Sequence, residues 1–175
     1  YFVLRFLIEN KIIKFKWFFI SCFVFTFFVC LDIFYQLIFS PETNWALKKD
    51  IFGFTSNHPR KITGPFGPEI IAGSYLQKFS IFGLFLFPFF FRLKRINLSI
   101  ILLSLFIIYT ITIILSGNRM ALILFIFTIL LILLFEKKTK KIIPPTLVIV
   151  SIIFFIFYSS NIHVKNNFNH LSTSI

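Results

Sequence analysis

Residues 98–135 read LSIILLSLFIIYTITIILSGNRMALILFIFTILLILLF, and this stretch decides the fold. Two apolar runs, Leu98–Leu115 and Met120–Phe135, are separated only by the short polar joint Ser116–Arg119. A helix of about 20 predominantly apolar residues crosses the hydrocarbon core of a bilayer, and each run approaches that length. The joint is long enough only for a tight turn. The stretch therefore predicts a hairpin of two membrane-spanning helices.

Three further apolar runs have the same character, namely Trp17–Phe39, Ile70–Phe91 and Ile142–Tyr158. Hydrophobic residues make up 58% of the 175-residue chain, whereas soluble domains contain about 45–50% apolar residues. Too little polar sequence remains to cover a water-soluble core of this size. We therefore predict an all-α, polytopic transmembrane helical bundle of about five spans. It forms a single domain over residues 1–175, with one long loop over residues 40–69.

The basic residues indicate how these spans are oriented. With five spans, three clusters of Lys and Arg fall on one side: Arg5, Lys11, Lys14 and Lys16; Arg92, Lys94 and Arg95; and Lys137, Lys138, Lys140 and Lys141. The other side carries fewer: Lys48, Lys49, Arg60, Lys61, Arg119 and Lys165. Lys and Arg are enriched in cytoplasmic loops. We therefore predict a multi-pass protein of the bacterial inner membrane with a cytoplasmic N-terminal segment and a periplasmic long loop.

The formal net charge of +12 is accordingly interpreted as a sign of membrane topology, and no nucleic-acid partner is expected. Cys22 and Cys30 lie roughly 12 Å apart along one predicted helix, which is too far for a disulfide. No spacing typical of metal ligands occurs in the sequence, so we expect no metal and no cofactor.

The long loop contains a basic and glycine-rich segment, RKITGPFGPE at residues 60–69. Arg60 and Lys61 stand close to Gly64 and Gly67. Glycine allows backbone to approach a ligand closely, and arginine offers a donor fork that suits phosphate oxygens. The segment is a candidate anion site, and the alternative is a solvated loop that touches lipid headgroups.

Arg119 is a second candidate because it lies in the turn that begins the fourth predicted span. Free backbone N–H groups and the positive end of the helix dipole favour anions at such a position. The alternative is an arginine that snorkels to lipid phosphate at the end of a span.

Two charged residues fall inside predicted spans, where ionisable groups are costly and usually face protein or a water-filled cavity. Lys78 is expected either to be buried with a partner or to follow an interfacial or re-entrant segment over residues 64–77. Asp32 shares a helix face with Gln36, four residues later. We consider Asp32 a candidate partner for Lys78 or Arg119, and the alternative is a structural pair without chemistry.

The turn SGNRMAL at residues 116–122 resembles the arginine turn of the O-antigen ligase and O-antigen polymerase superfamily. Two other stretches, DIFYQ at residues 32–36 and RKITGPFGPEIIAGSYL at residues 60–76, flank a loop containing FGF. Together they are similar to outer loops of polymerase-like members of bacterial polysaccharide gene clusters. The resemblance covers residues 32 to 135. Since the chain starts with Tyr1 and ends in a polar stretch, we expect a piece of a longer protein.

The resemblance implies a metal-independent membrane glycosyltransferase that polymerises or ligates a surface polysaccharide such as O-antigen on the periplasmic face. The implied partners are an undecaprenyl-diphosphate-linked oligosaccharide and membrane lipids. Arg119 matches the family arginine in the turn and Arg60 matches the outer-loop arginine, so both are predicted to be catalytic. The predicted substrate-binding residues are Lys61, Gly64, Gly67, Lys78 and Asp32.

Two other functions remain open from the sequence. One is a transporter or flippase component for the lipid-linked glycan. Transporters typically show internal repeats and broken helices, whereas we find no repeat, and the basic residues cluster at the outer edge and not along a path. The other is a non-catalytic, truncated membrane protein.

Overall fold

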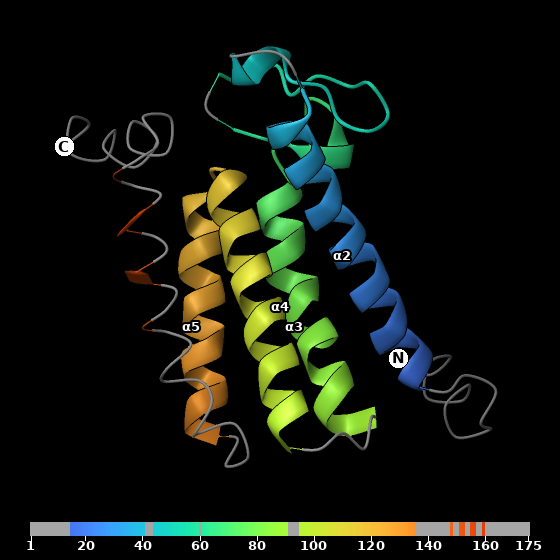
Figure 1. The fold of residues 1–175 in the computed structure, drawn as a ribbon, viewed down its shortest axis with the longest axis vertical. Helices are drawn as coiled ribbons and strands as arrows, with labels where there is room; N and C mark the ends of the chain where they lie inside the picture. Colours follow the sequence, from blue (N-terminus) through green and yellow to red (C-terminus); the bar gives the residue numbers. More distant parts are fainter. Residues whose placement is uncertain are drawn as a thin grey trace, which may run out of the picture.

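The computed structural model describes residues 15–40, 44–59, 61–90 and 95–135, together with residues 148, 151–152, 155–156 and 159. The main elements within these ranges are the helices α2 (Phe15–Ile38), α3 (Ala72–Phe90), α4 (Arg95–Leu115) and α5 (Arg119–Phe135). Two short 3₁₀ helices, Trp45–Leu47 and Gly64–Phe66, lie in the long loop (Figure 1). The predicted all-α class is confirmed for the part of the chain that is described.

The first four predicted spans coincide with α2, α3, α4 and α5 to within a few residues. Most of the fifth, Ile142–Tyr158, lies outside the described residues. By length and composition, one described helix is long and apolar enough to cross a membrane, over Lys16–Ile38 with a mean hydropathy of 2.2. The apolar stretches Ile100–Leu115 and Arg119–Leu131 are shorter. These helices therefore do not support the predicted count of five spans.

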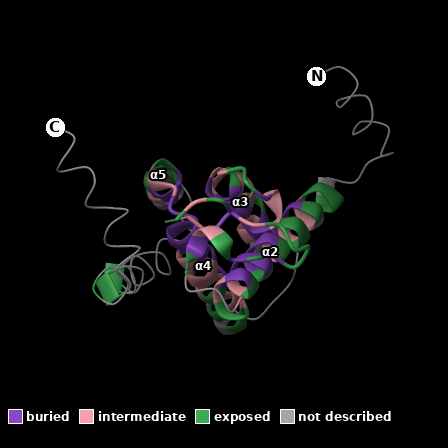
Figure 2. Ribbon diagram, turned by 90° about the horizontal axis from the view of Figure 1, so that it is seen from above, coloured by how far each residue is buried: buried purple, intermediate pink, exposed green. Residues whose placement is uncertain are grey.

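Helix α3 packs against α2, α4 and α5, and it lies between α5 and α2 in the view from above (Figures 1 and 2). Close approach to α2 is possible because a Cβ atom at Gly83 would lie only 3.3 Å from Phe23 Cα. Between α2 and α4, Thr26 Oγ1 and Tyr109 Oη form a buried hydrogen bond of 3.1 Å. The helices thus meet through small residues and paired hydroxyls as well as through apolar side chains, a pattern common between helices in membranes.

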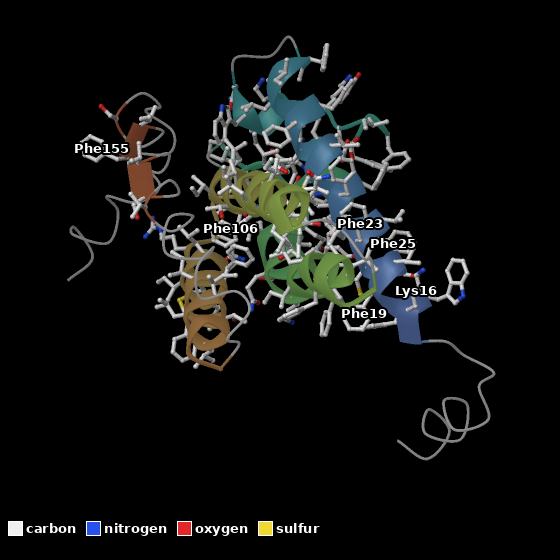
Figure 3. The ribbon with its side chains drawn as sticks, turned by 60° about the horizontal axis from the view of Figure 1, so that its bottom comes forward. Lys16, Phe19, Phe23, Phe25, Phe106 and Phe155 are labelled. Carbon is white, nitrogen blue, oxygen red and sulfur yellow. The ribbon has the colours of Figure 1, made fainter. Side chains whose placement is uncertain are left out.

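The bundle carries large apolar side chains on its outside as well as in its core. Large apolar side chains are exposed along α2 and α5, for example Phe25 at 59% and Phe127 at 56% (Figure 3 shows Phe25 on α2). The buried polar residues of the helices include Thr26, Asp32, Gln36, Ser80, Thr110 and Thr112. The described helices thus expose large apolar side chains and enclose several polar ones within a predominantly apolar core.

The long loop and the α4–α5 turn lie at the same end of the bundle, and the N-terminal end of α2 lies at the opposite end (Figure 1). The described helices therefore run alternately up and down the bundle. The assignment of the loop end to the periplasm stays a prediction. Because the described loop residues and the turn lie at the same end of the bundle, we consider them together as one candidate site.

Candidate functional site

One buried side chain of α2 holds both halves of the long loop. Gln36 Nε2 donates to the carbonyl oxygen of Lys48 at 2.8 Å, and Gln36 Oε1 accepts from the backbone N–H of Gly64 at 3.0 Å. The side chain is fully buried, so its amide replaces water for two loop backbone groups. Gln36 therefore fixes the glycine-containing segment against the end of α2.

Asp32 serves the same loop one turn deeper in α2. Its Oδ1 accepts from the backbone N–H of Ile51 at 2.8 Å, while Oδ2 is buried without a hydrogen-bond partner among the described residues. The expected ion pair with Lys78 or Arg119 is not formed, because the loop backbone reaches the carboxylate instead. Asp32 remains a predicted substrate-binding residue, but its observed contact is structural.

Lys48 and Asp50 are two buried charged residues whose roles the sequence analysis missed. Lys48 Nζ donates to the carbonyl oxygens of Leu37 at 2.8 Å and Ser40 at 3.3 Å, a favourable arrangement for a cation at a helix C-terminus. Asp50 Oδ1 accepts from Phe54 N at 2.7 Å, and its carbonyl oxygen accepts from Gly53 N at 3.1 Å. Aspartate followed three residues later by glycine is a recognisable turn signature, so Asp50 was detectable.

The structure brings the two basic motifs of the sequence together. The backbone N–H of Ile62 donates to the carbonyl oxygen of Leu115 at 3.4 Å, which joins the loop segment to the last residue of α4. The α4–α5 turn follows at once. Lys61, next to Ile62, and Arg119, at the start of α5, are both half-buried. The segment that carries Lys61 is therefore attached next to the turn that carries Arg119, although the two lie far apart in the sequence.

The turn that carries Arg119 is packed tightly onto α3. Asn118 Nδ2 donates to Ser74 Oγ at 2.9 Å, and Asn118 Oδ1 accepts from Ala121 N at 3.3 Å, which caps α5. Gly117 has a φ of +67°, a left-handed conformation suited to glycine. Arg119 is thereby placed at the N-terminus of a helix, as predicted.

The remaining predicted site residues have different positions. Arg60 lies outside the described residues. Lys78 has an exposed side chain, because the buried positions Leu76 and Ser80 define the opposite face of α3. The expectation of a buried Lys78 is therefore wrong. The alternative, an interfacial or re-entrant segment over residues 64–77, is not supported either, because residues 72–77 belong to the same helix α3 as Lys78.

Gly64 and Gly67 adopt left-handed backbone conformations, with φ values of +60° and +59°. A Cβ atom at Gly64 would lie 2.9 Å from Ile33 Cγ1 and 3.7 Å from Asp32 Oδ2. Gly64 thus allows the loop to approach α2 closely. The substrate-binding role of both glycines stays a prediction. The close contact with α2 explains why residue 64 is a glycine.

No group of three or more His, Cys, Asp or Glu side chains suited to a metal occurs in the described part of the chain. Cys22 and Cys30 are buried free thiols. Comparison with protein-family models, with curated proteins and with solved structures found no match to this chain. The site is therefore interpreted from its own geometry.

Replacing Gln36 by leucine is expected to loosen the long loop without unfolding the helices. The change leaves the Lys48 carbonyl and the Gly64 N–H without their partner, at a cost of about 1–3 kcal/mol for each buried group. Trypsin digestion at Lys48, Lys49 and Lys61 should accelerate by about tenfold or more. The control is Gln77→Leu, a half-buried glutamine of α3. Equal digestion rates in both variants would contradict the anchoring role of Gln36.

Proposed function

We propose that this chain is a multi-pass inner-membrane protein of about five spans that polymerises or ligates an undecaprenyl-diphosphate-linked glycan. The proposed site lies at the bundle end formed by the long loop and the α4–α5 turn, on the periplasmic face. The observation that carries the proposal is the hydrogen bond from Ile62 to Leu115, because it joins the Lys61 segment to the Arg119 turn.

The membrane location is supported by the surface of the helices. Side chains such as Val24, Leu31, Ile123 and Leu124 are 45–58% exposed along α2 and α5. Monomeric soluble proteins rarely expose large contiguous apolar patches. Acyl chains would cover these side chains at no cost in hydration. The same location accounts for the buried threonine, glutamine and aspartate side chains, since polar groups within spans usually face the bundle interior.

The chemistry follows from what half-buried cations do to a diphosphate. As an acceptor hydroxyl attacks the sugar carbon, the bond to the diphosphate breaks and negative charge grows on the leaving group. Fixed cations in a poorly hydrated site stabilise that charge more strongly than water does. Arginine stays protonated and offers a bidentate donor fork. We assign this role to Arg119, with Lys61 as a second cation and Arg60 as a further candidate from the family resemblance.

The helix N-terminus reinforces the assignment of Arg119. The first backbone N–H groups of α5 point toward the same end of the bundle as the loop, and the helix dipole is positive there. Asn118 satisfies one of these groups through its side chain. An anion bound beside Arg119 would therefore meet both a side-chain cation and backbone donors.

Deletion of the gene that encodes this chain tests the proposal. We expect loss or shortening of the surface glycan on a gel, with undecaprenyl-diphosphate-linked units accumulating on the outer face of the inner membrane. Complementation with the gene should restore the glycan. Units stranded on the inner leaflet would instead support a transporter, and an unchanged glycan pattern would leave no enzymatic role.

A further inference from the structure

Part of the long loop descends along the side of α2. Lys48 is bound to Gln36 through its carbonyl oxygen, and Ile51 is bound to Asp32 through its N–H. The ring of Phe52 then meets that of Phe28, with centroids 6.1 Å apart. The three helix positions are four residues apart and share one face of α2. The loop therefore lies against this face of α2, and Figure 1 shows the cyan segment at the upper end of the tilted helix.

The depth of the descent follows from helix geometry. Asp32 is six residues before Ile38, the last residue of α2, and thus lies roughly 9 Å below the helix end at 1.5 Å per residue. Phe28 lies roughly 15 Å below it by the same rise. A turn that only capped the bundle would not contact side chains at these levels.

In the turn at the tip, residues 51–54, three of the four backbone N–H groups donate to protein oxygens. The N–H of Ile51 is bound to Asp32, that of Gly53 to the Asp50 carbonyl and that of Phe54 to the Asp50 side chain. The Phe54 carbonyl in turn accepts from Asp50 N at 3.0 Å. Irregular backbone exposed to lipid does not occur within the hydrocarbon region. The backbone of this turn is therefore expected to stay at the level of the headgroups, and only its side chains can reach the acyl chains.

The side chains of the same turn are apolar and exposed. Ile51, Phe52 and Phe54 are 49%, 59% and 57% exposed, and their surface continues that of Phe28 on α2 through the ring contact. Lys49, just before the turn, is exposed as well. A lysine next to an apolar, internally bonded turn is the arrangement expected where side chains enter lipid and a cation stays at the phosphates.

We infer that the turn formed by residues 51–54 lies in the headgroup region of the leaflet at the loop end of the bundle, where the side chains of Ile51, Phe52 and Phe54 reach lipid acyl chains. The inference rests on the membrane location proposed above and is independent of the glycan chemistry. The lipid contact would also affect the position of the candidate site, because Gln36 binds both this part of the loop and Gly64 in the Lys61 segment. Anchoring of this turn in lipid would hold the candidate site at the level of the donor diphosphate.

Single cysteines test the inference in the full chain reconstituted into phosphatidylethanolamine and phosphatidylglycerol vesicles. The variants are Phe52→Cys and Phe54→Cys, with Lys49→Cys as the water-exposed control and Phe25→Cys as the reporter of membrane insertion. The native thiols Cys22 and Cys30 are buried, so the unmodified chain gives the background. A charged, membrane-impermeant maleimide should label Phe52→Cys and Phe54→Cys at least about tenfold more slowly than Lys49→Cys.

The outcomes separate the two proposals. Slow labelling of Phe52→Cys and Phe25→Cys with fast labelling of Lys49→Cys supports insertion of the side chains of this turn. Fast labelling of Phe52→Cys with slow labelling of Phe25→Cys overturns the inference and leaves the membrane location intact. Fast labelling of both overturns the membrane location as well. A Phe52→Cys disulfide dimer formed under mild oxidation would assign the turn to a second copy and overturn the lipid contact.

A spectroscopic measurement supplies an independent readout. Phe52→Trp fluorescence in a chain with Trp17 and Trp45 replaced by phenylalanine should be quenched by lipids brominated on their acyl chains. Lys49→Trp in the same background is the control and should be quenched less. Equal quenching of the two variants would contradict insertion of residue 52.

Discussion

Replacement of Arg119 by alanine is expected to abolish formation of the glycan product while the protein still reaches the membrane at its normal level. Removal of one donor that stabilises developing negative charge typically costs about 10²–10³ in rate. Arg119 is half-buried at the N-terminus of α5, where the charge of a bound diphosphate would be poorly screened. The measurement is glycan banding in a deletion strain that carries the variant, with immunoblotting of the membrane fraction.

Two companion variants make this test specific. Arg119→Lys keeps the charge but loses the planar donor fork, and its failure to restore the glycan would indicate a bidentate phosphate contact. Met120→Ala changes the exposed neighbouring residue and should behave like the unmodified protein. Normal glycan from Arg119→Ala at normal protein level would rule out the catalytic role of this arginine.

Replacement of Gly73 by valine is expected to displace the Arg119 turn and to destabilise the bundle. A Cβ atom at this position would overlap Ser116 Oγ and lie 2.8 Å from Asn118 Cβ. Ser116 Oγ is itself held by the carbonyl of Ile113 at 2.7 Å, so the turn has little freedom to yield. Overpacking of this kind costs about 1–3 kcal/mol. Thermal unfolding in detergent should show a lower midpoint, and glycan formation should fall although every candidate cation is present.

The matched control is Gly83→Ala in the same helix. Its Cβ would lie 3.1 Å from Tyr109 Oη and 3.3 Å from Phe23 Cα, which is also a crowded position but one distant from the turn. We expect some loss of stability and retained glycan formation. If Gly73→Val and Gly83→Ala reduced glycan formation equally at equal protein levels, the special role of the α3–turn contact would be refuted.

The positions of α2, α3, α4 and α5 were predictable because long apolar runs and short polar joints are local properties of the chain. The tight α4–α5 turn follows directly from Ser116–Arg119 in the sequence. The number of spans was not settled in this way. Gln77 and Lys78 lower the hydropathy of α3, and Arg95 and Asn97 open α4 with polar residues.

The partners of the buried polar residues were not predictable from spacing. Asp32 and Gln36 were correctly placed on one face of one helix, yet the sequence suggested a cation for Asp32 and the structure provides a backbone N–H at residue 51. Lys48 was counted as a loop charge and instead caps α2. In each case the side chain binds a segment that is distant in the sequence, and the local sequence pattern does not show which segment that will be.

The sequence by itself determined that the chain forms long apolar helices, that their joints carry the charges and that Arg119 begins one of them. Only the tertiary structure decided that the Lys61 segment meets the Arg119 turn and that residues 48–52 follow α2 downward. The physical reason is the sequence separation of the interacting residues. Helix formation depends on neighbours a few residues apart, whereas the site depends on hydrogen bonds such as Gln36 to Gly64 and Ile62 to Leu115, which join segments that only folding brings into contact.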